Sequence, residues 1–209
     1  MEKALIIGAG SVGGHLALNI KNYCDHLTIL GFLDDDQHKI GKVLFGYCVL
    51  GNVGYIKNFN DEISIIVGIA APNIKEHIFR KLQSKKNFNF PAMVSKNAWI
   101  SESVQIGDGS IIYPGVSINY ESAIGKFVTV NMNCALGHHT IIGDFVSLAP
   151  GVNTSGHVTI QAGCDVGIGV CMKQGVIVGE KSIIGGQAML IQNVPPNSKI
   201  GGVPGRVIQ

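Results

Sequence analysis

A six-residue period runs through the second half of this chain. Every sixth residue from Ile106 to Leu190 gives fifteen positions, and fourteen of them are aliphatic or methionine, with Thr154 the one departure. Chance would give about seven such residues at a hydrophobic content of 46%.

An α-helix repeats at about 3.6 residues and a strand at about 2, so neither element explains this period. A coil with three flat sides does. Each side contributes one inward residue, and the chain returns to the same corner after three times six, or eighteen, residues. The sequence therefore predicts a three-sided prism of stacked parallel coils from about residue 91.

The first 90 residues follow a different pattern, in which short apolar strands alternate with helical segments. We predict strands over 4–7, 27–33 and 63–69, a helix ending near residue 23, and a second helix over 73–85. Ile74, Ile78 and Leu82 share one face of that second helix. This alternation favours a small open parallel sheet whose ligand binds beyond the carboxyl ends of the strands.

A glycine-rich turn, Gly8-Ala9-Gly10-Ser11-Val12-Gly13, follows the first strand. It offers backbone NH groups and a helix N-terminus to a phosphate. Asp34 and Asp35 close the second strand, where a carboxylate can bind a sugar hydroxyl or a base. An NAD site is an alternative, but a dinucleotide needs two mononucleotide-binding halves and only about 90 residues precede the prism. A second alternative is that these glycines only form a tight turn and bind no ligand.

Charge and cysteine content narrow the possible partners. The net charge is +2 and no long run of Lys or Arg occurs, which argues against a nucleic-acid surface. The five cysteines are odd in number and form no Cys-X-X-Cys pair, so a reducing cytoplasm is expected rather than disulfides or a zinc ribbon. We expect no membrane association, because the chain has neither a signal sequence nor an apolar run of about 18 residues.

Four segments together resemble the sialic acid O-acetyltransferase-type family of sugar O- and N-acyltransferases. These segments are 6–10, 31–35, 138–143 and 201–206, and the resemblance extends over nearly the whole chain. The family includes bacterial enzymes that N-acetylate UDP-amino-dideoxy sugars or GDP-perosamine, and its hexapeptide repeats form a left-handed parallel β-helix.

The resemblance implies two domains, a homotrimer with active sites between subunits, and acetyl-CoA as cosubstrate. Residues 1–90 would form a small Rossmann-like α/β domain that binds a nucleotide-sugar. Residues 91–209 would form the left-handed β-helix that transfers the acyl group and ends in a CoA-binding tail.

The resemblance also assigns His138 as the catalytic base, since it stands five residues before Gly143. An imidazole can take the proton from an amine or hydroxyl as it attacks a thioester, and CoA leaves without a covalent enzyme intermediate. His139 follows where the family often carries a carboxylate, so Asp144 is a candidate to orient His138 instead. On a flat side the two histidines would point in different directions. An exposed histidine without a role is the alternative.

Further site residues follow from the resemblance. The nucleotide-sugar would contact Gly10, Ser11, Val12, Asp34, Asp35 and Gly68, and Asn131 would face the acceptor, with Asn133 as a structural alternative at a coil corner. The CoA groove would include Ser147, where some relatives carry a histidine, together with Ile168, Gly186, Gly205 and Arg206. The cysteines are expected to be core fillers, with a nucleophilic Cys134 the alternative.

N-acetylation of a nucleotide-linked amino sugar is the leading functional hypothesis. O-acetylation of a sugar such as sialic acid, acyl-carrier-protein-dependent acylation and a noncatalytic nucleotide-sugar-binding protein are alternatives. γ-Type carbonic anhydrases also use such coils, but they need three zinc-binding histidines. Only His138, His139 and His157 lie in the predicted prism, and their spacings indicate no matching set across coils, so no metal is expected.

Overall fold

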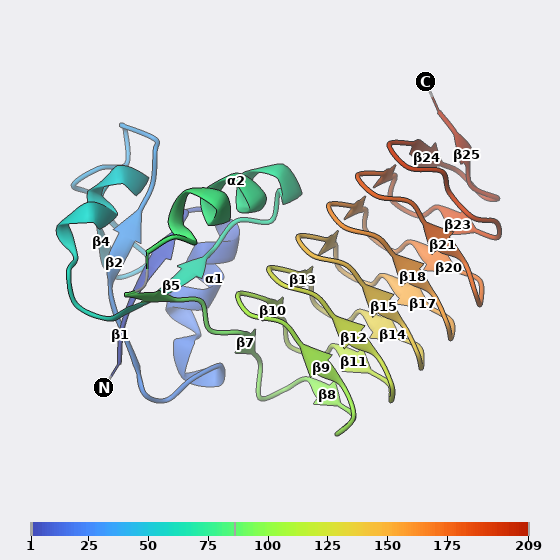
Figure 1. The fold of residues 1–209 in the computed structure, drawn as a ribbon, viewed down its shortest axis with the longest axis horizontal. Coiled ribbons are helices and arrows are strands. Elements are labelled where there is room, and N and C mark those ends of the chain that lie inside the picture. The colour runs from blue at the N-terminus through green and yellow to red at the C-terminus, as the bar shows by residue number, and fades with distance from the viewer. Residues whose placement is uncertain (1, 86, 209) are drawn as a thin grey trace. The chain divides into compact units, whose positions relative to one another are not determined.

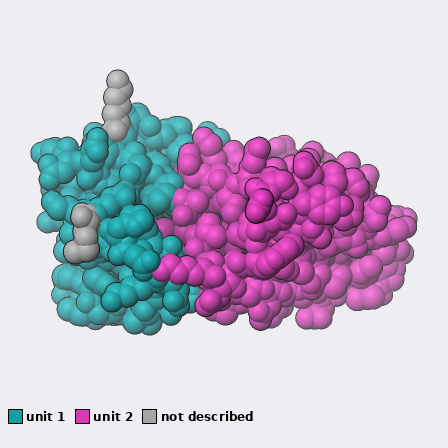
Figure 2. Space-filling view, turned by 90° about the horizontal axis from the view of Figure 1, so that it is seen from below, with its two compact units in different colours: residues 1–70, 74–91 teal, residues 71–73, 92–209 magenta. Residues whose placement is uncertain are grey.

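The computed structural model describes residues 2–85 and 87–208. The chain divides into two compact units, which Figure 2 colours separately. The first unit comprises residues 1–70 and 74–91, and the second comprises residues 71–73 and 92–209.

The first unit is built on a six-stranded sheet in the order β3-β4-β2-β1-β5-β6. Its strands are β1 (Glu2–Ile7), β2 (Leu27–Leu33), β3 (Val43–Leu44), β4 (Tyr47–Gly51), β5 (Ile63–Val67) and β6 (Phe88–Asn89). All neighbours pair in parallel except β3 and β4, which form an antiparallel hairpin. The three strands predicted here are present, whereas β3, β4 and β6 were not predicted.

The helices of this unit are shorter than the sequence predicts. They are α1 (Ser11–Leu18), η1 (Ile20–Asn22), η2 (Val53–Asn58) and α2 (Pro72–Leu82). The helix expected to reach residue 23 stops at Leu18, and the Asn19 side chain donates to the carbonyl of His15 at 2.8 Å. An asparagine that bonds the backbone in this way competes with helix continuation, so the last turn tightens into η1.

Close packing of β1, α1 and β5 brings the glycine-rich turn and the strand ends together. A Cβ on Gly13 would lie 1.9 Å from the carbonyl oxygen of Gly8, and a Cβ on Gly68 would lie 2.6 Å from the Cα of Gly13. Only glycine fits such approaches. The start of α1 and the carboxyl end of β5 are therefore neighbours.

The second unit is the predicted left-handed parallel β-helix, with three sheets as the sides of the prism (Figure 1). We name these sheets the first, second and third sides. The first side comprises β7 (Met93–Val94), β10 (Ile111–Ile112), β13 (Thr129–Val130), β16 (Ser147–Leu148), β19 (Asp165–Val166), β22 (Ile183–Ile184), β24 (Lys199–Gly201) and the antiparallel β25 (Arg206–Val207).

The other two sides follow the same pattern. The second side comprises β8 (Trp99–Ile100), β11 (Ser117–Ile118), β14 (Ala135–Leu136), β17 (Asn153–Thr154), β20 (Cys171–Met172) and β23 (Met189–Leu190). The third comprises β9 (Gln105–Ile106), β12 (Ala123–Ile124), β15 (Ile141–Ile142), β18 (Thr159–Ile160) and β21 (Ile177–Val178). From β7 to β23, each strand residue pairs with the one eighteen positions later, as Ile112 does with Val130, whereas β22 pairs with β24 at an interval of sixteen.

The six-residue series forms the core of the prism. Every member from Ile112 to Leu190 is buried, and Ile106 is half-buried. A second buried series of smaller residues, two positions before the first, runs from Ser110 to Ala188 and was not predicted. Thr154, the departure from the apolar series, has its hydroxyl 3.1 Å from that of Thr140, so each buried hydroxyl has a partner.

Cysteines also belong to this second series. Cys134 and Cys164 are fully buried, as expected for core fillers. Burial raises the pKa of each thiol to about 11, which disfavours the thiolate that a nucleophile needs. Among the residues that the structure describes, no helix combines the length and apolar character required to cross a membrane.

Candidate active site

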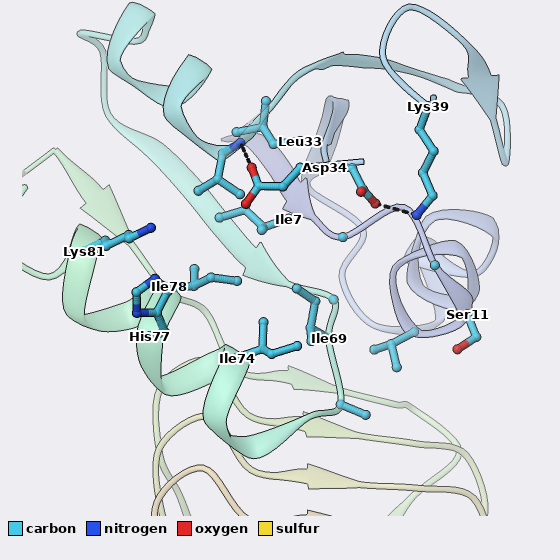
Figure 3. Close-up of a pocket in the computed structure, with 17 residues that line it drawn as sticks. Ile7, Ser11, Leu33, Asp34, Lys39, Ile69, Ile74, His77, Ile78 and Lys81 are labelled. Atoms are coloured by element: carbon cyan, nitrogen blue, oxygen red, sulfur yellow. Dashed lines mark hydrogen bonds and ion pairs between the residues drawn. The ribbon is translucent and has the colours of Figure 1, made fainter. Parts of the chain in front are cut away.

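A cavity of about 490 Å³ lies at the carboxyl ends of β1, β2 and β5 (Figure 3). The two strands that flank β1 are reached by connections in opposite directions, which makes this edge a topological switch point. All six residues predicted for the nucleotide-sugar in this unit line the cavity: Gly10, Ser11, Val12, Asp34, Asp35 and Gly68.

Asp34 holds the glycine-rich turn in place. Its Oδ2 accepts hydrogen bonds from the backbone NH of Ala9 at 2.8 Å and from Lys39 Nζ at 2.9 Å. Its Oδ1 accepts one from the NH of Asp36 at 3.0 Å. Burial raises the pKa of Asp34, but these hydrogen bonds outweigh it and hold the pKa below its ordinary value. Asp34 is therefore ionised at neutral pH, and its oxygens are engaged by the chain itself.

Asp35 is the more accessible of the two carboxylates. Its side chain is exposed, and its Oδ1 accepts a hydrogen bond from the NH of Val53 at 2.9 Å. That contact fixes the side chain at the cavity wall while the rest of the carboxylate faces solvent. A sugar or base hydroxyl is a suitable partner for it.

Four cavity residues come from one face of α2 and were not predicted. Ile74, His77, Ile78 and Lys81 line the cavity, at the i, i+3, i+4 and i+7 spacing of a helical stripe (Figure 3). Ile74 shares a helix face with Ile78 and Leu82, as predicted, but it is 45% exposed and forms part of this wall, whereas the other two are buried. Lys81 adds positive charge that suits phosphate, whereas Lys39, which also lines the cavity, forms an ion pair with Asp34.

His138 lies in the turn between β14 and β15, in the second unit. Its ring stacks on that of Tyr120, with centroids 5.3 Å apart and planes 10° apart. On the other side is Gly156, where an added Cβ would lie 2.5 Å from His138 Cε1. Tyr120, His138 and Gly156 are eighteen residues apart and occupy the same corner of successive coils, so the imidazole is held between an aromatic ring and a bare backbone.

The partner of His138 is its neighbour in sequence. The Nδ1 atoms of His138 and His139 are 3.0 Å apart. The expectation that the two side chains point apart is wrong, because they lie in a turn, where His139 has a positive φ of 58°, and not on a flat side. When His138 Nδ1–H donates to His139 Nδ1, Nε2 of His138 is left to accept a proton.

Asp144 does not orient His138. It lies in the turn between β15 and β16, at another corner, and its Oδ1 accepts a hydrogen bond from the NH of Lys126 at 2.8 Å. The prediction that Asp144 orients His138 is therefore wrong. The carboxylate common in the family is replaced by the second imidazole.

The three histidines of the prism gather at one corner, contrary to the sequence analysis. His157 follows His139 by eighteen residues, one full coil, and their rings stack with centroids 4.5 Å apart. The candidate ligand nitrogens of His138, His139 and His157 all lie within 4.8 Å of one another. The spacing was misread because His139, not His138, is the residue in coil register with His157.

The residues predicted for the acceptor and the CoA groove do not meet His138 within one chain. Asn131, Ile168 and Gly186 lie at the corner between the first and second sides, and Ser147 is on the first side. His138 lies at the corner between the second and third sides. Asn131 Oδ1 accepts from the NH of Met132 at 2.8 Å, while Asn133 takes the positive-φ corner position.

Ile168 and Gly186 form one stretch of that corner. They are one coil apart, and a Cβ on Gly186 would lie 3.0 Å from Ile168 Cγ2. Ile168 is 56% exposed, so its side chain faces solvent beside the bare Gly186. Gly205 and Arg206 line a smaller cavity of about 180 Å³ against residues 190–195 at the last coil.

Comparison with known proteins adds to this geometry. Residues 3–82 match the PglD N-terminal domain family. The GDP-perosamine N-acetyltransferase of Escherichia coli O157:H7 is 31% identical over 210 residues, which cover 96% of this chain and 94% of that protein. The chain belongs to the sialic acid O-acetyltransferase-type family of sugar O- and N-acyltransferases. This confirms the resemblance, and the protein is thus an acyltransferase.

Solved structures agree with this family. The acetyltransferase domain of PglB from Neisseria gonorrhoeae is 26% identical, with a TM-score of 0.90 and complete coverage of both chains. PerB from Caulobacter crescentus, solved with CoA and GDP-perosamine, has a TM-score of 0.89 over 100% of this chain and 98% of that one. At 22% identity the latter likeness shows the shared fold.

Proposed function

We propose that this acyltransferase transfers the acetyl group of acetyl-CoA to the amino group of a nucleotide-linked sugar, with His138 as the general base. The observation that carries the proposal is the His138 ring, fixed between Tyr120 and Gly156 and supplied with a hydrogen-bond partner in His139. A base must be held at a fixed angle to the proton that it removes.

The domain predicted over residues 1–90 binds the nucleotide. The diphosphate lies against the start of α1, where the NH groups of Ser11 and Val12 precede the first complete helical hydrogen bonds. Lys81 adds positive charge at the same cavity, and Asp35 accepts a hydrogen bond from a hydroxyl of the sugar.

The transfer proceeds by direct attack. The amine nitrogen forms a bond to the thioester carbonyl carbon while His138 Nε2 accepts a proton from that nitrogen. The carbon–sulfur bond then breaks, and the CoA sulfur takes up a proton as it leaves. No metal is needed, because CoA is a good leaving group and the imidazole performs both proton transfers.

CoA binds along the corner that carries Ile168 and Gly186, near Ser147 and towards Gly205 and Arg206 in the tail, with Asn131 facing the acceptor. Since these residues lie at a different corner from His138 within one chain, the acetyl group meets the base of a neighbouring subunit. A homotrimer provides this arrangement. The outward residues Ile141 and Ile177, 51% and 42% exposed on the third side, are apolar surface that a neighbour would cover.

The five cysteines, none in a disulfide, suit the reducing cytoplasm. The bacterial relatives named for GDP-perosamine make a GDP-linked amino sugar the first substrate to test.

The test is an assay of free thiol release with acetyl-CoA and a panel of GDP- and UDP-linked amino sugars, with mass spectrometry of the product. We expect one acetyl group on the sugar nitrogen. The His138→Ala variant serves as the inactive control. Acetylation of a hydroxyl sugar in preference to every amino sugar would contradict the proposal, as would full activity of the His138 variant. Sedimentation of a stable monomer would contradict the trimer.

A further inference from the structure

The three-histidine corner has the composition of a metal site. His138 is half-buried and His139 and His157 are exposed, so a dissolved ion can reach all three rings. His138 and His157 are edge to face, with centroids 5.0 Å apart, and His139 stacks on His157. The three imidazoles thus surround one small volume, and their candidate nitrogens lie within 4.8 Å of one another.

These distances are close to those of a bound zinc ion. Zinc binds imidazole nitrogen at about 2.0–2.1 Å, which places two ligands of a tetrahedral site about 3.3 Å apart. The two Nδ1 atoms of His138 and His139 are already 3.0 Å apart. His157 needs only a side-chain rotation, which its exposure allows.

We propose that His138, His139 and His157 bind a divalent transition metal, with Zn²⁺ the best match, and that the bound ion inhibits the enzyme. Three neutral imidazoles with an open fourth position suit Zn²⁺, and an all-nitrogen set excludes Mg²⁺ and Ca²⁺, which prefer oxygen. Inhibition rests on the proposed function: a metal bound at Nδ1 of His138 leaves the ring's proton on Nε2, so Nε2 no longer accepts the proton of the amine.

The coil geometry explains why the site exists in this chain. His139 and His157 are the positive-φ corner residues of successive coils, with φ of 58° and 60°. Parallel stacking at an eighteen-residue interval places equivalent corner residues directly over one another. Because both corner positions are histidine and lie next to His138, the stacked side chains supply ligands for one metal ion.

The first experiment measures binding without reference to activity. Untagged, metal-free protein is titrated with ZnCl₂ by calorimetry, and with CoCl₂ while the visible absorption of tetrahedral cobalt is followed. We expect one ion per chain. His157→Gln should weaken Zn²⁺ binding at least about tenfold. Loss of a residue that only hydrogen-bonds to a metal ligand already weakens binding by about that factor, and His157 is proposed as a ligand itself. His26→Gln, a change at an exposed histidine in the other unit, should leave binding unaltered.

The second experiment measures acetyl transfer against ZnCl₂ concentration. Wild-type protein should lose activity as the ion binds and regain it with EDTA. His157→Gln, compared with its own metal-free rate, should resist inhibition by a factor matching its loss of affinity. The absence of a Zn²⁺ or Co²⁺ signal, or equal binding by the His157 variant, would overturn the site. Binding that His157→Gln abolishes, without inhibition of the wild type, would support the site and overturn the inhibition, whereas the role of His138 as base is tested separately by His138→Ala.

Discussion

Gly156→Ala is the substitution that most directly tests how His138 is held. The added Cβ would lie 2.5 Å from His138 Cε1 and 2.6 Å from Nε2. Carbon atoms in contact are separated by about 3.5–4.0 Å, so the imidazole must move by about 1 Å. Tyr120 stacks on the opposite side of the ring and opposes a simple retreat, which leaves rotation away from its present orientation.

The expected loss follows from that displacement. A misplacement of about 1 Å at a reacting group can cost about a hundredfold in rate. We therefore expect kcat for acetyl transfer to fall by about a hundredfold, with little change in the KM for either substrate. The fold should survive, because the backbone of Gly156 lies outside the left-handed region and accepts alanine, and because the clash is with a partly exposed side chain.

Steady-state kinetics and thermal unfolding of the same preparation measure the two effects separately. The control is the same substitution in a His138→Ala background, where the clash no longer exists and Gly156→Ala should cost nothing more. Wild-type kcat in the single variant would refute the account of the held ring. An equal further loss in the His138→Ala background would show that Gly156 acts through something other than His138.

Three further predictions concern the residues that bind substrate and position the base. Asp35→Ala should weaken nucleotide-sugar binding by about 1–3 kcal/mol and leave acetyl-CoA binding nearly unchanged, as measured by calorimetry; equal losses for both ligands would contradict the division of labour between the units. His138→Ala should lower kcat by about a hundredfold or more, and His139→Ala by less, since His139 only holds Nδ1; the reverse order in a kinetic assay would reassign the base. Asp34→Asn should lower the free energy of unfolding by about 1–2 kcal/mol at pH 7. Because the folded pKa of Asp34 is depressed, its contribution is present above about pH 4 and is lost as the pH falls below that, so denaturant melts of variant and wild type should converge in acid.

The prism could be predicted because its repeat is long and its inward positions are chemically uniform. One inward aliphatic residue per side leaves a six-residue signal that no other element produces. The second inward series escaped notice, because it mixes Ser, Thr, Cys and Val at positions such as Ser110, Thr140 and Cys164. Small polar residues are buried there with their hydroxyls bonded to backbone or to one another, as Ser110 Oγ is to the carbonyl of Gly125 at 2.8 Å.

The nucleotide cavity could be predicted only in part. The glycine-rich turn and the aspartates have a fixed order in sequence and fixed places at the strand ends, so all six chosen residues line the cavity. The α2 stripe has no motif. Its residues alternate between apolar and basic at helical spacing, which is also the pattern of an ordinary amphipathic helix. Ile74 and Lys81 line the cavity because α2 lies beside the strand ends, and the sequence pattern does not indicate that position.

His138 and His139 show why spacing along the sequence does not by itself predict side-chain neighbours in a β-helix. The alternation of side chains along a strand predicted that His138 and His139 point apart. They lie in a turn instead, where the positive φ of His139 brings their Nδ1 atoms to 3.0 Å. A proximity rule selected Asp144, six residues away, although six residues is one side of the prism and leads to the next corner. Eighteen is the interval that brings residues together, and it joins His139 to His157 and His138 to both Tyr120 and Gly156. In such a fold the neighbours of a catalytic residue are therefore found one coil before and after it, and the identity of those residues decides whether the ring is packed, polarised or chelated.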